Sequence, residues 1–308
     1  MSAVSQYSRR RRDKIDETAG RSLTADALIR LRRSPTAIVG AVLVGLFVLI
    51  SVFAPLIAPH DPAQAFPELL DGLRPGTIPG PQDGFPLGSD QNGRDEFSRL
   101  VLASRQTLLV GVLATLLGLS VGVLIGAVAG ALGGWVDTVL MRVTDVLLSI
   151  PSLLLAISIA ALAARPSQGT VIVAVALVNV PIFARLLRGS MLAQRESDHV
   201  LAATALGVRR RAIVLRHMIP NAVGPVIVQA TLTLATAILD AAALSFLGLG
   251  DADPARAEWG LMLASAQPFL DVRPALAFYP AIAIIVVALG FTLLGESLRE
   301  ALDPKGRR

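Results

Sequence analysis

Residues 196–221, ESDHVLAATALGVRRRAIVLRHMIPN, are polar and rich in arginine, and they separate two apolar runs that are each long enough to cross a bilayer. Ser197 and Asp198 are suited to begin a short helix, and the alanines that follow leave one face of it with little side-chain bulk. Gly207 can turn the chain with a positive φ angle. The sequence therefore predicts a small-faced helical hairpin at 196–219, of a kind that docks into a groove of a soluble partner.

The second arm of the predicted hairpin is basic and runs from Arg209 to His217. Pro220 follows where it can open the next membrane helix, because a residue at the start of a helix does not need its N–H. An arginine-rich loop between spans can also be only a topology signal, since basic residues gather on the cytoplasmic side. Both interpretations remain open at this point, and both place the hairpin in the cytoplasm.

The whole chain has the composition of a membrane protein. Its 308 residues are 53% hydrophobic and 17% charged, which is far more apolar than an ordinary soluble domain. The net charge of +5 comes from basic residues next to the spans, so membrane lipid rather than nucleic acid is the expected contact. The absence of cysteine excludes disulfides and thiolate metal sites.

Lysine usage bears on the source of energy. The only lysines are Lys14 and Lys305, and neither lies in the glycine-rich pattern of a phosphate-binding loop. The histidines His60, His199 and His217 show no metal-ligand spacing, and no catalytic motif is present. We therefore expect no catalytic residue, metal or cofactor on this chain, and any driving ATP and Mg²⁺ to be bound by partner subunits.

The apolar runs predict an all-α integral membrane protein with about six transmembrane helices and both termini in the cytoplasm. The expected divisions are a basic cytoplasmic segment (1–35), a first transmembrane helix (36–58), an extracytoplasmic loop (59–104), a core of five helices that contains the hairpin (105–300), and a cytoplasmic tail (301–308). A cleaved signal peptide is disfavoured, because the first apolar run is longer than a signal core.

The later spans are expected at about 106–132, 143–164, 170–187, 220 onward and 274–294, with a separate interfacial helix at 94–104. Pro151 is expected to kink the third span. Asp145 is expected to pair with Arg142, which lies one helical turn away.

Glycines recur at every fourth position of the second span, at Gly118, Gly122, Gly126 and Gly130, and predict close helix packing. Three polar residues are candidates for the translocation path: Asn179, Gln229 and Asp240. Asn179 near mid-membrane suits helix contact and path lining equally. Asp240 is expected near the outer interface, because it lies about 30 Å along the helix from Pro220.

Five blocks of sequence resemble the membrane-spanning permeases of ABC importers. They are Leu201-Ala202-Ala203 with Gly207 and Ile219-Pro220; Pro86-Leu87-Gly88 with Asp90-Gln91 and Gly93-Arg94-Asp95; the run at 245–250; Trp259-Gly260 with Met262-Leu263; and the ending at 294–304. Together they resemble the second permease, or C subunit, of oligopeptide, dipeptide and nickel importers over roughly 85–304. Leu201 departs from the family pattern, which has a glutamate there.

The resemblance implies a type I importer permease fold in a bacterial or archaeal inner membrane. It also implies a second homologous permease as heterodimer partner, two ABC ATPases on the cytoplasmic side and an extracytoplasmic substrate-binding protein. The residues implied in ATPase coupling are Leu201, Ala202, Ala203, Gly207, Arg209, Arg210 and Pro220. Peptides are favoured over nickel as cargo, since no His or Cys cluster appears. An ion-coupled carrier and a non-transporting scaffold are the alternatives.

Overall fold

The computed structural model describes residues 23–74, 76–251, 253 and 256–302, and over these residues the fold is all-α. The elements are α2 (Leu23–Arg33), α3 (Pro35–Ile57), η1 (Pro67–Leu69), α4 (Glu96–Leu132), α5 (Gly134–Ser149), α6 (Ser152–Ala161), α7 (Gln168–Arg195), α8 (Asp198–Ala205), α9 (Arg210–Ile213), the π-helical η2 (Val214–Met218), α10 (Ile219–Ala222), α11 (Gly224–Phe246), α12 (Trp259–Ala266), η3 (Gln267–Phe269) and α13 (Ala275–Leu302). The predicted basic terminal segments with Arg9–Arg12 and Lys305 lie outside the described residues.

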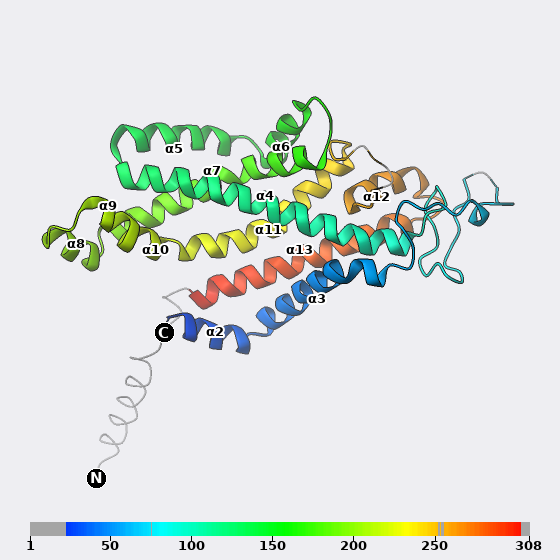
Figure 1. Cartoon of the computed structure of the whole chain (residues 1–308), viewed down its shortest axis with the longest axis horizontal. Helices are drawn as coiled ribbons and strands as arrows, with labels where there is room; N and C mark the ends of the chain where they lie inside the picture. The colour runs from blue at the N-terminus through cyan, green and yellow to red at the C-terminus, as the bar shows by residue number, and fades with distance from the viewer. Residues whose placement is uncertain (1–22, 75, 252, 254–255, 303–308) are drawn as a thin grey trace, which may run out of the picture.

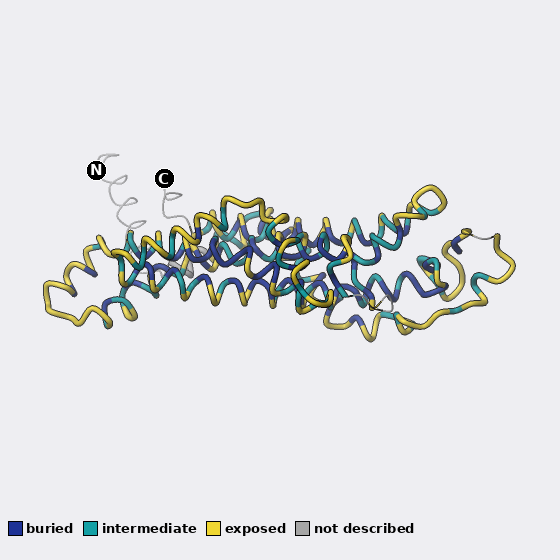
Figure 2. The backbone as a smooth tube through the Cα atoms, turned by 90° about the horizontal axis from the view of Figure 1, so that it is seen from above, coloured by how far each residue is buried: buried dark blue, intermediate teal, exposed yellow. Residues whose placement is uncertain are grey.

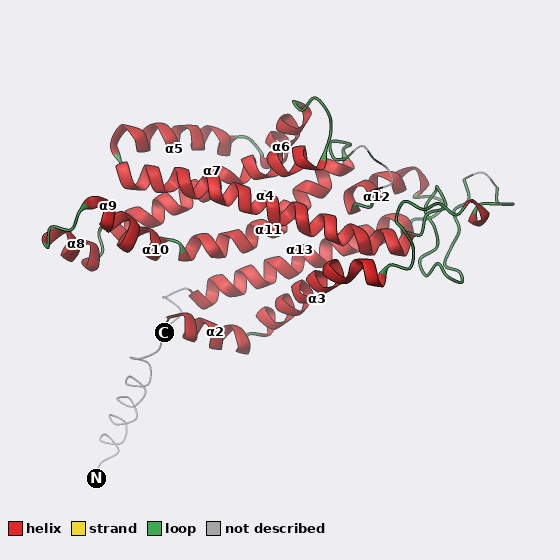
Figure 3. Ribbon diagram, viewed as in Figure 1, coloured by secondary structure: helices red, strands yellow, loops and turns green. Residues whose placement is uncertain are grey.

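The long helices lie side by side in an elongated bundle (Figure 1). Helices α2, α8, α9 and α10 lie toward one end, and α12 lies toward the other with the loop at 58–95, as Figure 3 shows. Buried residues follow the middle of the bundle, while exposed residues gather at its two ends (Figure 2). The arginine-rich hairpin and the loop at 58–95 therefore lie at opposite ends of the bundle, as the predicted topology requires. The end with this loop is called the outer end, and the loop is called the outer loop.

Five of the described helices are long and apolar enough to cross a membrane, namely α3, α4, α7, α11 and α13. The pair α5–α6 passes the same test only as a unit, and its two halves meet at 95°. Since α4 ends toward the hairpin and α7 begins in the opposite half, α5 and α6 together carry the chain across (Figure 1). The protein is a multi-pass membrane protein whose third crossing is broken.

The break in the third crossing lies at Ile150 and Pro151. Ile150 is extended, with φ −90° and ψ 131°, because the ring of a following proline disfavours the helical conformation. The sequence predicted a kink at Pro151 within one helix from 143 to 164. The structure corrects this to two helices, because Ile150 and Pro151 both leave the helical conformation.

The second crossing begins earlier than expected. Asp95 is the N-cap of α4, and its carboxylate accepts hydrogen bonds from the N–H groups of Phe97 and Ser98. The helix then runs for 37 residues, free of proline, to Leu132. The prediction of a separate helix at 94–104 was therefore wrong, because nothing after the cap interrupts the helical hydrogen bonds.

Helix α4 lies along α7 through a seam of glycines. A Cβ atom on Gly118 would lie 2.8 Å from the carbonyl oxygen of Ala176, and one on Gly126 would lie 2.5 Å from that of Ala184. A Cβ atom on Gly122 would lie 2.6 Å from the Val180 carbonyl oxygen, and one on Gly130 would lie 3.0 Å from Met191 Cβ. Because a larger residue would overlap α7, the seam keeps these two helices in close contact over much of their length.

The fifth crossing starts later than predicted. Pro220 lies in the first turn of the short helix α10, and α11 begins only at Gly224, beside a second proline, Pro225. Asp240 lies half-buried near the end of α11 that is remote from the hairpin. Helix α11 ends in a Schellman motif around Gly248, whose φ is +79°, with Leu249 N–H bonded to the Leu244 carbonyl.

The outer loop is fastened to α4 by buried charges. Asp90 accepts hydrogen bonds from Arg94 Nε at 2.7 Å and from the backbone N–H of Arg94 at 2.9 Å. A nitrogen of Arg99 lies 3.6 Å from the same carboxylate, and all three residues are buried. The turn is closed by Gly93 at φ +72°, where a Cβ would lie 2.8 Å from the Phe66 carbonyl oxygen.

A second anchor involves the capping residue Asp95. Its carboxylate accepts the hydroxyl hydrogen bond of Ser98 at 2.5 Å and lies 3.1 Å from His60 Nδ1. The His60 ring contacts the rings of Phe66 and Phe85, each with a centroid separation of 4.9 Å. The start of the loop, its middle and the first turn of α4 therefore share one packed cluster.

Candidate functional site

The predicted hairpin is present and projects beyond the bundle as α8, α9, η2 and α10 (Figure 1). Its first arm is α8, which begins after Ser197 as expected. The Ser197 hydroxyl does not cap the helix. It donates instead to the Gln194 carbonyl of the preceding helix at 2.5 Å, so that α7 and α8 are tied together at their junction.

A Schellman motif ends the first arm. Gly207 adopts a φ of +75°, its N–H bonds to the Thr204 carbonyl, and the N–H of Val208 bonds to the Ala203 carbonyl. Since L side chains rarely adopt this φ, the glycine has a backbone reason to be there. The motif fixes the direction in which the second arm leaves the turn.

The exposed face of the first arm is apolar. Leu201 is 55% exposed, Leu206 at the turn is 83% exposed, and Ala202 between them is exposed as well. Ala203 was predicted to belong to this docking face, and the structure corrects that prediction. Its side chain is only 8% exposed and packs in a cluster with Ile213 and Met218 of the second arm.

The predicted coupling arginines have different surroundings. Arg209 is exposed at the N-terminus of α9. Arg210 is also among the residues implied in ATPase coupling, and its Nη2 donates to the carbonyls of Ala131 at 2.6 Å and Leu132 at 3.1 Å. Those are the last carbonyls of α4, which need donors because a helix leaves them unpaired. Arg210 therefore links the hairpin to the end of α4.

The second arm is not a regular helix. Residues Val214–Met218 form a π-helical segment, in which the N–H of Ile219 bonds to the Val214 carbonyl five residues back. Pro220 follows directly, and Asn221 Nδ2 donates to the His217 carbonyl at 2.6 Å. Such segments are often found at functional sites, and this one lies between the hairpin turn and the fifth crossing.

The histidines lie in unexpected positions. His199 and His217 come from opposite arms of the hairpin, with ring centroids 6.5 Å apart, and His60 contacts Asp95 in the outer cluster. No group of three metal-binding side chains occurs among the residues that the structure describes.

Two ion pairs join α5 to α7 on the hairpin side of the broken crossing. Arg188 donates to both carboxylate oxygens of Asp137, at 3.0 and 2.6 Å, and Arg185 pairs with Asp145. The prediction that Asp145 pairs with Arg142 was therefore wrong. The sequence offered one signal for these pairs, namely two aspartates in the stretch at 134–149 and two arginines one helical turn apart in the stretch at 168–195.

The three path candidates do not meet through hydrogen bonds in the described part of the chain. Asn179 is buried where α7 packs on Gly118 of α4, and its Nδ2 donates to the Val175 carbonyl at 2.8 Å. Gln229 bonds to Thr233 within α11 at 3.4 Å. Asn179 and Gln229 thus bond within their own helices, and Asp240 is half-buried further along α11.

Comparisons with known proteins give concordant results. The family described as binding-protein-dependent transport system inner membrane component matches residues 122–308. The family described as the N-terminal TM domain of oligopeptide transport permease C matches residues 22–75.

Among curated relatives, the dipeptide transport system permease protein DppC of Alkalihalophilus pseudofirmus is 40% identical over 91% of this chain and 89% of that protein. The glutathione transport system permease protein GsiD of Escherichia coli O6:K15:H31 is 41% identical over 90% of this chain and 88% of that protein. A solved structure titled as inward-facing conformations of the MetNI methionine ABC transporter aligns with a TM-score of 0.55 at 16% identity, over 67% of this chain and 96% of that chain. That likeness supports the fold.

Proposed function

Because the chain belongs to the family of binding-protein-dependent transport system inner membrane components, we propose that it is a permease subunit of an ATP-driven importer of short peptides. The names of the dipeptide and glutathione relatives support the cargo, since glutathione is itself a small peptide. In this proposal the chain pairs with a second permease in a prokaryotic cell membrane. A substrate-binding protein delivers peptide outside, and two ATPases bind the hairpin inside.

This chain is proposed to transmit ATP hydrolysis rather than to perform it. Its two lysines are terminal and lie in no phosphate-binding loop. ATP and Mg²⁺ would therefore be held by the ATPases, and the hairpin would carry their movement into the helices. Such coupling requires that the hairpin bind the ATPase differently in the inward-open and outward-open states, since equal affinity shifts no equilibrium.

The observation that carries this proposal is the contrast between the two faces of the hairpin. Leu201, Ala202 and Leu206 are exposed, while Ala203 and Arg210 face back toward the bundle. An apolar groove on the partner would accept this exposed face of the hairpin. Leu201 would fit the groove without the contact that the glutamate of the family pattern makes. Arg210 would then pass the movement directly to α4, because its donor groups hold the last α4 carbonyls.

Movement of α4 would be shared with α7. The glycine seam allows no gap between the two helices, and the ion pairs from Asp137 and Asp145 join α7 to α5. The break at Ile150 and Pro151 interrupts the helix between α5 and α6, but Ala156 and Ala160 of α6 are buried in one cluster with residues of α4 and α7. The hairpin, α4, α5, α6 and α7 are thus proposed to move together.

The test co-purifies the ATPase with the full membrane complex. The variant Ala202→Trp adds bulk to the exposed face and is expected to abolish recovery of the ATPase and ATP-dependent peptide uptake. Ala193→Trp, at an exposed position of α7 outside the hairpin, is the matched control. Equal recovery of the ATPase with both variants would contradict the docking role. Peptide uptake by the purified chain alone would contradict the importer and favour a secondary carrier.

A further inference from the structure

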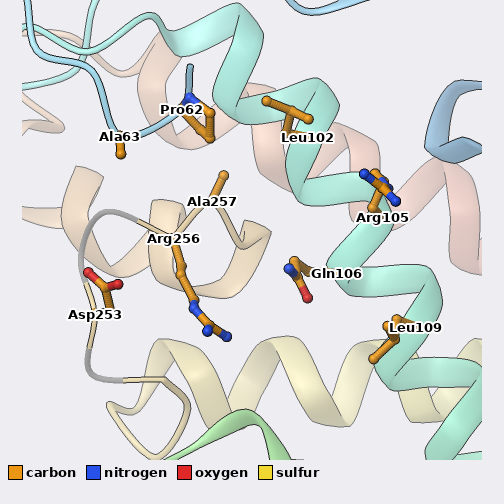
Figure 4. A pocket seen from close by; sticks show the side chains of 9 residues that line it. All are labelled: Pro62, Ala63, Leu102, Arg105, Gln106, Leu109, Asp253, Arg256 and Ala257. Atoms are coloured by element: carbon orange, nitrogen blue, oxygen red, sulfur yellow. The ribbon is translucent and has the colours of Figure 1, made fainter. Parts of the chain in front are cut away.

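A cavity of about 480 Å³ opens in the outer half of the molecule, away from the hairpin. Figure 4 shows that its walls come from α4, from the loop at Pro62 and Ala63, and from the segment before α12 that carries Arg256 and Ala257. This volume is in the range of small-ligand sites, which is about 300–1,000 Å³. Leu102 and Leu109 give one side an apolar lining.

Buried hydrogen bonds hold the walls of this cavity in place. Arg99 is buried behind it, and its guanidinium donates to the Pro62 carbonyl at 2.8 Å and to the Arg256 carbonyl at 3.5 Å. Trp259 Nε1 donates to the Leu100 carbonyl at 2.9 Å, which fastens the start of α12 to α4. These bonds therefore hold three segments that are far apart in the sequence in fixed positions around the opening.

The polar groups in the cavity are mostly donors. Arg105 projects from α4 and makes no ion pair with any described residue. Gln106 accepts a hydrogen bond from Gln168 at 2.6 Å, and its own amide N–H groups have no protein acceptor among the described residues. Arg256 adds a second guanidinium, which is paired with Asp251 at 3.0 Å, and Asp253 is the one acid in the lining.

A guanidinium next to a free amide N–H group, in a partly apolar cavity, is the chemistry that recognises a carboxylate. We propose that this cavity is a binding site for the free C-terminal carboxylate of the peptide, with Arg105 and Gln106 as its donors. The inference rests on the proposed peptide importer and adds a site on the permease itself. Peptide released from the binding protein would be held here before it enters the membrane.

The test uses the complete importer in proteoliposomes, with ATP inside and peptide-loaded binding protein outside. Uptake of a dipeptide is compared with uptake of the same dipeptide carrying a C-terminal amide. Arg105→Gln is expected to lower the acid-to-amide uptake ratio about tenfold, as loss of a charged hydrogen bond implies. Arg105→Lys, which keeps the positive charge, is expected to restore part of the ratio.

The matched control is Arg74→Gln, which removes an exposed arginine from the outer loop and is expected to leave the acid-to-amide uptake ratio unchanged. The binding protein's own preference cancels, because it is the same for every variant. A ratio for Arg105→Gln equal to that of Arg74→Gln overturns the site, and so does an equal loss of both cargoes. If the wild-type importer takes up no peptide at all, the proposed function itself fails.

Discussion

At the outer end of the molecule, Asp90 is enclosed by Arg94 and Arg99, and all three side chains are buried; at the hairpin end, Leu201 and Leu206 project from the bundle. The outer loop is long but is closed onto α4 by buried charges. The hairpin is short, and among the described residues its hydrogen bonds to α4 come from Arg210. The buried charges of the outer end thus have their partners within the chain, whereas the apolar face of the hairpin is left exposed.

The largest effect is expected when the outer anchor is broken. Asp90→Ala leaves two buried guanidinium groups without their carboxylate, which costs about 4 kcal/mol in comparable buried pairs. We expect the free energy of unfolding, measured with SDS in mixed micelles, to fall by about that amount.

Asp83→Ala is the control, since Asp83 is exposed in the same loop. A loss for Asp90→Ala no greater than for Asp83→Ala would show that the outer loop is no more firmly held than the hairpin.

The glycine seam joins the two ends, and overpacking it is expected to have the next largest effect. Gly126→Ala places a Cβ atom 2.5 Å from the Ala184 carbonyl oxygen, so α4 and α7 must separate. We expect a loss of about 2 kcal/mol in the free energy of unfolding, together with reduced uptake.

The matched control for the seam is Gly45→Ala in α3, where nothing lies within 4 Å of the added atom. It is expected to be neutral or slightly stabilising, since alanine favours a helix. If both variants behave alike, α4 and α7 are not held together by close backbone contact.

A smaller effect on stability, but a specific one on transport, is expected at the hairpin. Arg210→Gln removes the donors from the last α4 carbonyls and is expected to lower the free energy of unfolding by about 1 kcal/mol. ATPase binding is expected to survive, while the peptide imported per ATP hydrolysed falls several-fold. Arg216→Gln, at an exposed position of the same arm, is expected to keep wild-type coupling.

Equal coupling in the two arginine variants would mean that the hairpin does not act through α4. The hairpin end would then not transmit movement to α4, although the buried ion pairs around Asp90 at the outer end would be unaffected.

The sequence predicted what depends on local patterns. The lengths of the apolar runs predicted where the crossings lie. Gly207 predicted a turn, and in the structure a Schellman motif forms that turn. The inward orientation of Ala203 was not predictable in this way, because it depends on how the two arms pack on each other. The 95° break was underestimated, since Pro151 indicates a disturbance of the helix but not its angle.

The contacts that the sequence did not predict are mainly those between distant segments. Arg210 bonds to residues 78 and 79 positions away, and Arg188 to one 51 positions away, so neither contact has a local pattern. One signal was present in the sequence. Helix α4 ends at Gly133 with no basic residue in its last turn, so its carbonyls need donors from another segment.

The smallest effect is expected from pH at the outer end, through Glu258 before α12. Burial raises the pKa of this carboxyl group above its usual value, and neighbouring Asp251 raises it further, while the hydrogen bond from Ser245 partly offsets both. The folded state therefore binds the proton more tightly than the unfolded state. Stability from this group is full below the unfolded pKa of about 4.5 and is lost as the pH rises through the folded pKa.

Glu258→Gln is expected to flatten this part of the stability–pH profile of the purified complex, because the glutamine carries no titrating proton. Glu68→Gln, at an exposed position of the outer loop, is expected to leave the profile unchanged. An unaltered profile for Glu258→Gln would show that the carboxyl group is hydrated in the folded state. The segment that carries Glu258 would then be open to water, and in this respect the outer end would resemble the exposed hairpin.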